Sequence, residues 1–460
     1  MNFLRRKLVY REYLKLLDRS ESQLIDFKDK RISVSKLSDT ISAFANADGG
    51  EVFIGITELT GSKPIWDGFK DEEEVNPIVQ TLENMLYLNC QYSAEFLEYS
   101  EKGLVLKLII NKSSKIIYTP AKKAFKRRNA QNLELKTPDE IRQLELNKGV
   151  YSHEDFILDV NLEEINNSIS ICEFLIDNSF EDVEPDNFLK KNNLVIKGKP
   201  RVSGLLLFSD YPQAFIDRCG IKIVRYNTSS EIPERNDMIG TPLTEEGCLY
   251  KLIYSSVEKV EDIISTISST IQSDMDVYPQ ETLHEIITNA ILHRDYSIKD
   301  DIQIRVFNNR VEVESPGILP GYITIQNILN QRYSRNGTIV RVINKFKNPP
   351  NKDIGEGLNT AFNAMRKSGL MPPTIKQKEN SILVVIPNRK IPGCTEVLLQ
   401  LLDTHGILTS DEIKRKSIFK SIDVQRQSLR KLREDGTIEI VSGTYGSDTA
   451  YRLVSNTNKT

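Results

Sequence analysis

The sequence predicts an α+β protein that is built from several domains. The chain has 460 residues, and at roughly 100–200 residues per domain it is long enough for two to four of them. Apolar residues recur at helical spacing in some segments and alternate in others, which indicates mixed helices and strands. The pattern changes near Gly149, and Pro392-Gly393 precedes a helical tail. We therefore expect domains at 1–149, 150–277, 278–390 and 391–460.

Composition and charge limit the partners that can be expected. Lys+Arg 61 against Asp+Glu 64 give a net charge of -3, so nucleic acid must be contacted by local basic patches rather than by bulk charge. No apolar run is long enough for a membrane helix, and the start of the chain lacks the apolar core of a secretory signal. Five dispersed cysteines favour a reducing compartment. We expect a cytoplasmic protein without a membrane partner.

The first candidate site lies in the segment ESQLIDFK, residues 21–28. The alternation over 24–28 predicts a strand, and Asp26 and Lys28 would project from the same face of it. Carboxylates that hold Mg²⁺ or Mn²⁺ beside a lysine are what a metal-dependent phosphodiesterase needs, because the metal activates water and polarises the phosphate. The same alternation is typical of a solvated strand face, so both interpretations stay open.

A helix over 34–45, a turn at 46–50 and a strand over 51–56 follow this segment. The turn reads NADGG, and a tight turn that uses the positive φ of glycine is one explanation for it. Together, E-S-x-x-x-D-F-K and the string FANADGGEVFIGI resemble the Schlafen-type, Alba-like N-terminal domain of Schlafen proteins and many bacterial proteins. The resemblance spans about 130 residues and implies an α+β domain that binds nucleic acid, DNA or RNA.

In Schlafen relatives that cut RNA, three acidic residues form the active site. Glu21 and Asp26 match the first two, with Asp where Glu is usual. The third acid follows the second strand, where this chain has Thr57 and then Glu58, so Glu58 is the candidate. The resemblance thus implies a catalytic group of these acids with Lys28, and a metal held by Glu21 and Asp26. The basic segment KKAFKRR, residues 122–128, either tracks a nucleic-acid backbone beside this site or forms a solvated loop.

The second candidate site begins on a predicted helix with the sequence EIITNAILHRD. Glu285, Asn289 and His293 are spaced four residues apart and share one helix face. On a helix that lines a cavity, Asn289 would supply an oxygen to Mg²⁺ on a triphosphate, and Glu285 would orient or deprotonate the attacking water. A solvated helix face has the same pattern, and both interpretations stay open.

Two further motifs follow this helix in the order SPG and GEG. Gly355 and Gly357 precede a predicted helix and would let phosphate approach its N-terminal N–H groups. The three segments together resemble the GHKL ATP-binding fold, and most closely its RecG-like branch, over about 278–388. The resemblance implies ATP as the cofactor. The adenine-reading D-x-G-x-G box is replaced here by Ser315 and Gly317, which would contact the base through the serine hydroxyl.

The tail predicts helices at 395–404, 409–416 and 422–434 and a two-stranded ribbon at 437–453, which together indicate a winged helix-turn-helix. The third helix carries clustered cations that would enter a major groove. These are Arg426, Arg430, Lys431 and Arg433. Because the tail as a whole is nearly neutral, a protein-docking or dimerisation module is the alternative.

The sequence therefore predicts an ATP-binding, nucleic-acid-acting protein in which a Schlafen-like α+β domain, a GHKL-type α/β sandwich and a winged helix are fused. The leading hypothesis is an ATP-regulated, metal-dependent endonuclease, and bacterial proteins of this type are candidates for anti-phage defence. The alternative is an ATP-responsive transcriptional regulator without nuclease activity, and a third is an ATPase that remodels a partner protein. The GHKL resemblance also implies a homo-oligomer. The connector shows no motif of a catalytic or binding site. Strands are predicted in it at 202–208 and 221–226.

Overall fold

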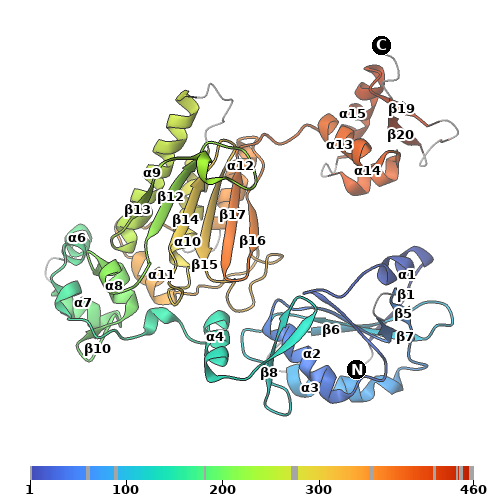
Figure 1. The fold of residues 1–460 in the computed structure, drawn as a ribbon, viewed down its shortest axis with the longest axis horizontal. Coiled ribbons are helices and arrows are strands. Elements are labelled where there is room, and N and C mark those ends of the chain that lie inside the picture. Colours follow the sequence, from blue (N-terminus) through green and yellow to red (C-terminus); the bar gives the residue numbers. More distant parts are fainter. Residues whose placement is uncertain are drawn as a thin grey trace. The chain divides into compact units, whose positions relative to one another are not determined.

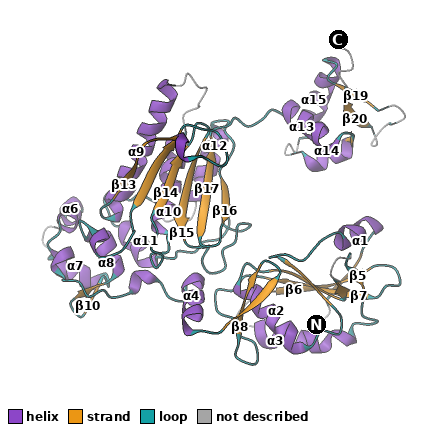
Figure 2. Cartoon of the chain, in the orientation of Figure 1, coloured by secondary structure: helices purple, strands orange, loops and turns teal. Residues whose placement is uncertain are grey.

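The computed structural model describes residues 3–58, 63–86, 92–180, 183–270, 278–351, 357–417, 421–441, 444 and 449–454. They belong to two compact units, one of residues 1–365 with 372–388 and the other of residues 366–371 with 389–460. Figure 1 follows the chain from blue at its start to red at its end. Helices and strands occur together in both units, which confirms the expected multidomain α+β fold (Figure 2).

The first unit starts with a five-stranded sheet in the order β1-β6-β7-β3-β2. β1 runs parallel to β6 and β2 parallel to β3, while β7 runs antiparallel to its two neighbours. The elements of this part are β1 (Leu4–Lys7), α1 (Tyr10–Leu17), β2 (Ile25–Lys28), α2 (Val34–Asn46), β3 (Gly50–Ile54), β4 (Ile56–Thr57), β5 (Ile65–Trp66), α3 (Asn76–Leu86), β6 (Tyr92–Glu98), β7 (Leu104–Ile110), β8 (Ala124–Arg128), β9 (Gln131–Leu135) and α4 (Pro138–Lys148).

Both faces of this sheet are covered, because its strands alternate between two apolar clusters. Leu106 packs with residues of α2 and α3, whereas its neighbour Val105 packs with residues of α1. Phe27 belongs to the α1 side, so Asp26 and Lys28 project toward the opposite face. The expected strand and the shared face of Asp26 and Lys28 are therefore confirmed, with the Lys28 ammonium 2.6 Å from Asp26 Oδ2.

The turn between α2 and β3 depends on glycine and on a buried asparagine. Gly50 has a φ of +149°, and a Cβ there would lie 2.5 Å from the carbonyl oxygen of Leu24. Asn46 Nδ2 donates to the carbonyls of Ile117 (2.9 Å) and Phe125 (3.0 Å), and its Oδ1 accepts from Ile117 N–H (2.8 Å). Because these groups are buried, Asn46 fixes the chain around β8 onto α2.

A helical region follows α4, and in it one sequence expectation is wrong. The segment Val202–Phe208 forms helix α8 instead of a strand. Its seven residues are all buried, so no polar face was present to reveal the period of the helix. The other elements here are α5 (Glu163–Asn166), α6 (Ile169–Asp177), α7 (Pro185–Lys191), β10 (Val195–Ile196) and β11 (Lys199–Pro200).

A second sheet, of six strands, forms the rest of the first unit in the order β13-β12-β14-β15-β17-β16. Some strands of this sheet come from the segment before residue 278, and a helix from the same segment packs on it. The sheet therefore begins within the expected connector. Figure 1 shows helices α9 and α10 packed along one side of this sheet. Its elements are β12 (Ile221–Tyr226), β13 (Met238–Glu245), α9 (Leu249–Thr270), α10 (Gln280–Leu292), β14 (Ile302–Val306), β15 (Arg310–Pro316), α11 (Gly337–Ile343), α12 (Gly357–Lys367), β16 (Thr374–Gln377) and β17 (Ser381–Pro387).

The described residues of the second unit form three helices after residue 390 and a three-stranded sheet in the order β18-β20-β19. Leu398, Leu402, Leu429 and Leu432 belong to its buried core. Its elements are α13 (Cys394–His405), β18 (Leu408–Thr409), α14 (Ser410–Lys416), α15 (Ile422–Glu434), β19 (Ile438–Ile440) and β20 (Ala450–Leu453). The helices lie within a residue or two of their expected bounds. Across the described parts of the chain, no helix is long and apolar enough to cross a membrane.

Candidate functional sites

A cavity of about 760 Å³ lies beside helix α10 in the second sheet's domain. α10 presents Glu285, Asn289 and His293 to this cavity, and the end of β15 presents Ser315 and Gly317. α10 is held in place by burial of its apolar side chains and by a hydrogen bond from the Thr282 hydroxyl to Ala361 O (3.1 Å). The expected helix therefore lines a cavity and is not a solvated face.

Glu285 and Asn289 form a pair on consecutive turns of α10. Asn289 Nδ2 donates to Glu285 Oε1 over 2.6 Å. Burial raises the pKa of Glu285, although this hydrogen bond opposes the shift. Because its amide nitrogen is committed to Glu285, the amide oxygen is the atom with which Asn289 can bind a cation.

Glycine at the first residue of α12 leaves room for the Glu285 carboxylate in this pair. A Cβ at Gly357 would lie 1.7 Å from Glu285 Oε1. The backbone at the N-terminus of α12 therefore lies next to the cavity, and Gly357 is one of the residues that line it. Gly355, the other glycine of this motif, lies outside the described residues.

His293 ends α10 and lines the cavity as a neutral group. Burial lowers the pKa of His293 to about 4, with a smaller contribution from Arg335. The imidazole is therefore uncharged near neutral pH, and it contributes shape and one donor rather than a cation. Among the described residues its Nδ1 has no hydrogen-bond partner.

Ser315 and Gly317 shape the end of β15. The Ser315 hydroxyl donates to Ala290 O over 2.7 Å, so its oxygen is left as an acceptor. Such an acceptor suits an exocyclic amino group, which adenine carries. Gly317 has a φ of +114°, and a Cβ there would lie 2.8 Å from Asp295 Cβ. Glycine is thus required where β15 passes close to Asp295.

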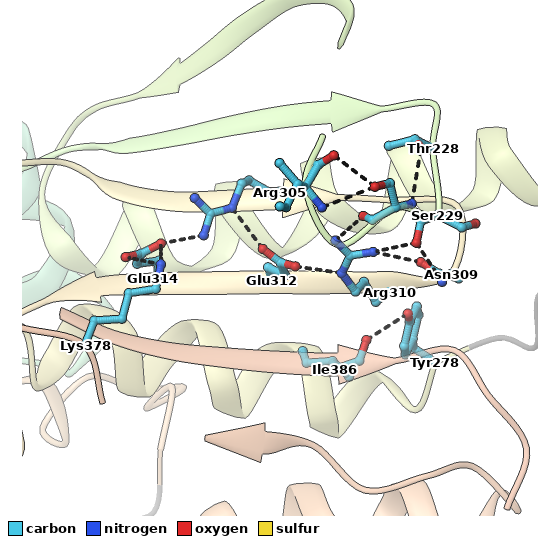
Figure 3. Close-up of polar contacts among 12 residues, drawn as sticks. Thr228, Ser229, Tyr278, Arg305, Asn309, Arg310, Glu312, Glu314, Lys378 and Ile386 are labelled. Carbon is cyan, nitrogen blue, oxygen red and sulfur yellow. Dashed lines mark hydrogen bonds and ion pairs between the residues drawn. The ribbon is translucent and has the colours of Figure 1, made fainter. Parts of the chain in front are cut away.

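The opposite face of β15 carries a ladder of ion pairs, which Figure 3 shows along the strands. Arg305 contacts Glu312 (3.1 Å) and Glu314, and Arg310 contacts Glu312 (2.6 Å). Lys378 lies 2.8 Å from Glu314. Residues two apart on a strand share a face, so these acids point away from the cavity that Val313 and Ser315 line. The ladder therefore fixes β15 against β14 without contacting a ligand in the cavity.

The acid site of the first domain is built around Asp26, which is fully buried. Arg127 donates to Asp26 Oδ1 (3.2 Å), and Lys28 lies 2.6 Å from Oδ2. Glu21 accepts from Phe27 N–H (3.0 Å) and lies 3.6 Å from the Lys28 ammonium. Glu21, Asp26 and Lys28 are thus brought together as expected, and Asp26 is not on a solvated strand face.

The two acids titrate as a pair. Burial and a hydrogen bond with Glu21 raise the pKa of Asp26 to about 6, despite the nearby cations. For Glu21, burial by itself favours the neutral form, but the hydrogen bonds from Asp26 and Phe27 lower its pKa. The two carboxyl groups therefore share a proton on the acid side of neutrality.

Glu58 is not brought into this site. It is exposed, and within the described ranges no group of three His, Cys, Asp or Glu side chains is placed to hold a metal ion. The neighbouring Thr57 hydroxyl lies 3.3 Å from Asp29 instead. The described residues thus offer two acids and two cations rather than three acids.

Arg127 was not singled out by sequence reasoning. It lies on β8, within the basic segment expected either to track nucleic acid or to be a solvated loop, and it is 2% exposed. Its guanidinium also donates to Ser22 O and Ile25 O and lies over the Phe44 ring. The alternation of Phe125 and Arg127 with Lys126 and Arg128 was the available sign of a strand.

A groove opens next to the acid site. It is lined by three cations, Lys28, Arg31 and Lys36, by two acids, Asp29 and Asp39, and also by Phe125 and Asn132. Its volume is about 660 Å³. Arg31 is paired with Asp29 over 2.7 Å, so Lys28 and Lys36 are the cations of this groove that are best placed to contact a phosphate backbone.

In the second unit, the four expected cations of α15 are exposed, while Leu429 and Leu432 hold the helix on the core. Arg430 is paired with Glu434 over 2.7 Å. Arg426, Lys431 and Arg433 have no ion pair among those found for the described residues, so these three are freer than Arg430 to contact a phosphate.

Two family models match parts of this chain. Residues 21–136 match the family described as Schlafen, AlbA_2. Residues 299–386 match the family described as putative ATP-dependent DNA helicase recG C-terminal. The chain fuses a Schlafen/AlbA_2 segment to a RecG-like segment. The expected fusion is thereby confirmed, whereas the winged helix stays a prediction.

Comparisons at the level of whole proteins add little. No curated protein matches the chain. One solved structure that matches is the DIP2311 protein from Corynebacterium diphtheriae, at 17% identity and a TM-score of 0.41. The match covers 94% of this chain and 92% of that chain.

Asp26→Asn is expected to change how stability depends on pH. A raised carboxyl pKa contributes stability that is present below the ordinary value of 3.8 and is lost as pH rises through about 6. Relative to the variant, wild type should therefore lose on the order of 2 kcal/mol between about pH 4 and pH 7. Urea unfolding at a series of pH values measures this difference.

Asp29→Asn is the matched control, because the Asp29 pKa is lowered by the hydrogen bond with Arg31 and its contribution is constant over the same range. Parallel stability curves for wild type and Asp26→Asn would contradict the shared proton.

Proposed function

We propose that this protein binds Mg-ATP in the cavity beside α10 and acts on nucleic acid through the groove beside Asp26. The RecG-like and Schlafen/AlbA_2 matches support the two halves of this proposal, an ATP-binding part and a nucleic-acid-related part. The observation that carries the first half is the convergence of Glu285, Asn289, Ser315 and Gly357 on one cavity.

In this proposal each cavity residue has a separate task. Asn289 would hold Mg²⁺ through its amide oxygen, and the ion would neutralise part of the triphosphate charge. Glu285 would orient or deprotonate water, and its raised pKa makes it a stronger proton acceptor than an exposed glutamate. Ser315 would accept a hydrogen bond from the adenine amino group, and His293 would pack as a neutral ring.

Asn289→Ala is expected to lower Mg-ATP affinity by at least about 100-fold, because it removes the protein ligand of the metal. Glu285→Gln should retain binding and lose any hydrolysis. Isothermal titration calorimetry with Mg-ATP measures the first effect, and phosphate release measures the second. Asn161→Ala, at an exposed asparagine outside the cavity, is the control. Unchanged affinity in Asn289→Ala would refute the assignment.

For the second half we propose a metal-dependent endonuclease centre at Glu21 and Asp26. The support is a pair of carboxyl groups that share a proton, next to Lys28 and a groove to which Lys28 and Lys36 contribute positive charge. A divalent ion that replaced this proton would supply activated water and offset charge on the phosphate. Lys28 would then shift from Asp26 toward the phosphate, and Arg127 would keep Asp26 oriented.

A second candidate function is an ATP-responsive regulator that binds nucleic acid without cutting it. The specific observation that favours it is the burial of Asp26 between two cations, because its charge is offset without a metal. In this case α15 would contact duplex DNA through Arg426, Arg430, Lys431 and Arg433, and the second unit would act as a winged helix.

One assay separates the two functions. Wild type is incubated with single-stranded RNA, single-stranded DNA and duplex DNA in the presence of Mn²⁺, with and without ATP. The endonuclease proposal expects cleavage that Asp26→Ala reduces at least about 100-fold while Mg-ATP binding is unchanged. No cleavage of any substrate, together with duplex binding that is lost when Arg426 and Arg430 are both changed to Ala, would establish the regulator instead.

A further inference from the structure

One wall of the nucleotide cavity is formed by a long loop between β15 and α11. Residues from Ile318 to Ser334 line the cavity along this loop. This loop is held by hydrogen bonds to the first 149 residues of the same unit. Lys112 Nζ donates to Leu319 O (2.7 Å) and Ile323 O (3.1 Å), and the loop residue Tyr333 donates to Gly149 O (3.0 Å).

Removing the hydrogen-bond partners of Lys112 would cost free energy of folding, because its charged side chain is only 4% exposed. Burial lowers the pKa of Lys112 to about 8, and Asp48, 3.9 Å away, partly restores it. Breaking a buried charge away from its oxygen partners is strongly unfavourable. A shift of the loop at Leu319 and Ile323 would therefore carry Lys112 with it.

Asp48 receives a second connection from the same wall. Leu319 N–H donates to Gln377 Oε1 (3.0 Å), and Gln377 Nε2 donates to Asp48 Oδ1 (3.2 Å). Asp48 belongs to the FANADGG turn between α2 and β3. Both connections from the cavity wall, one through Lys112 and one through Gln377, thus end on a single carboxylate.

From Asp48 the contacts continue to the acid site. Gln23 Nε2 donates to Asp48 Oδ2 and to Arg127 O, both over 3.3 Å. Gln23 Oε1 accepts from Asn129 N–H (2.7 Å), so Gln23 holds the turn of the β8–β9 hairpin. The guanidinium of Arg127 then contacts Asp26.

We propose that Asp48, with Lys112 and Gln23, is a relay that couples nucleotide occupancy of the cavity to the position of Arg127 at the acid site. The inference rests on the proposed function, since it requires that the cavity binds a nucleotide and that the groove binds nucleic acid. A nucleotide that repositions the loop pulls on Asp48 through two connections, and Gln23 transmits the shift to the hairpin that carries Arg127. Coupling of this kind is reciprocal, so nucleic acid must change nucleotide affinity by the same factor.

The test measures this factor in the full chain. The dissociation constant of the Mg complex of a non-hydrolysable ATP analogue is determined by calorimetry, with and without a saturating single-stranded RNA or duplex DNA. In wild type the ratio of the two constants is expected to be about fivefold or more. In Asp48→Ala the ratio should fall to within about twofold of unity, while affinity for the analogue alone is retained.

Asp48 is 29% exposed, so its removal is expected to leave the fold intact. Lys112→Met, which breaks one of the two connections, provides a second variant and should reduce the ratio in part. Asp18→Ala is the matched control, because Asp18 is an exposed acid in the same domain that pairs with Lys63. Thermal unfolding of each variant confirms that it is folded.

The outcomes are distinct. A wild-type ratio of unity, or an unchanged ratio in Asp48→Ala, overturns the relay even though both ligands bind and the proposed function stands. If wild type binds no nucleotide, the proposed function itself fails and the relay fails with it. A ratio that falls to near unity in Asp48→Ala and stays at the wild-type value in Asp18→Ala supports the relay.

Discussion

Buried cations bound to main-chain carbonyl oxygens organise the first unit. Arg127 binds the carbonyls of Ser22 and Ile25, and Lys112 binds those of Leu319 and Ile323. Lys148 donates to Ala45 O and Ser113 O. A buried charge is tolerated only while its partners stay in place, so each of these cations fixes two distant segments of chain at a defined separation.

This constraint explains why the two candidate sites are physically connected. Arg127 positions Asp26, and Lys112 holds a wall of the nucleotide cavity. Arg335 adds to the same wall, since it is buried, contacts Asp295 over 2.9 Å and donates to Ile318 O. Because Asp48 and Gln23 connect these buried cations, the proposed relay would let a change in one site alter the other without large domain movement.

Motifs carried by local spacing could be predicted from the sequence. The helix bearing Glu285 and Asn289, and the strand bearing Asp26 and Lys28, follow from periodicities of 3.6 and 2. The helix α8 could not be predicted, because its residues are apolar on every side and show no period. Its true state depends on packing among helices that are distant in sequence.

The residues that each motif contacts could not be predicted, because they are distant in the sequence. Arg127 stands 101 positions from Asp26, and Lys112 stands 207 positions from Leu319. In the sequence, Arg127 is one of several cations, and only its two-residue spacing from Phe125 separates it from those that are exposed. The expected third acid, Glu58, was chosen by its place after a strand, and the structure leaves it exposed on the following turn.

Hydrogen–deuterium exchange of the full chain, with and without the Mg complex of a non-hydrolysable ATP analogue, tests the central claim most directly. The account predicts changes in protection in the cavity wall at 317–336 and also in the segments around Asp48, Gln23 and the β8–β9 hairpin, because hydrogen bonds of Lys112, Gln377 and Gln23 join these segments. Changes confined to the cavity lining, with exchange around Gln23 and Arg127 unaltered, would contradict it.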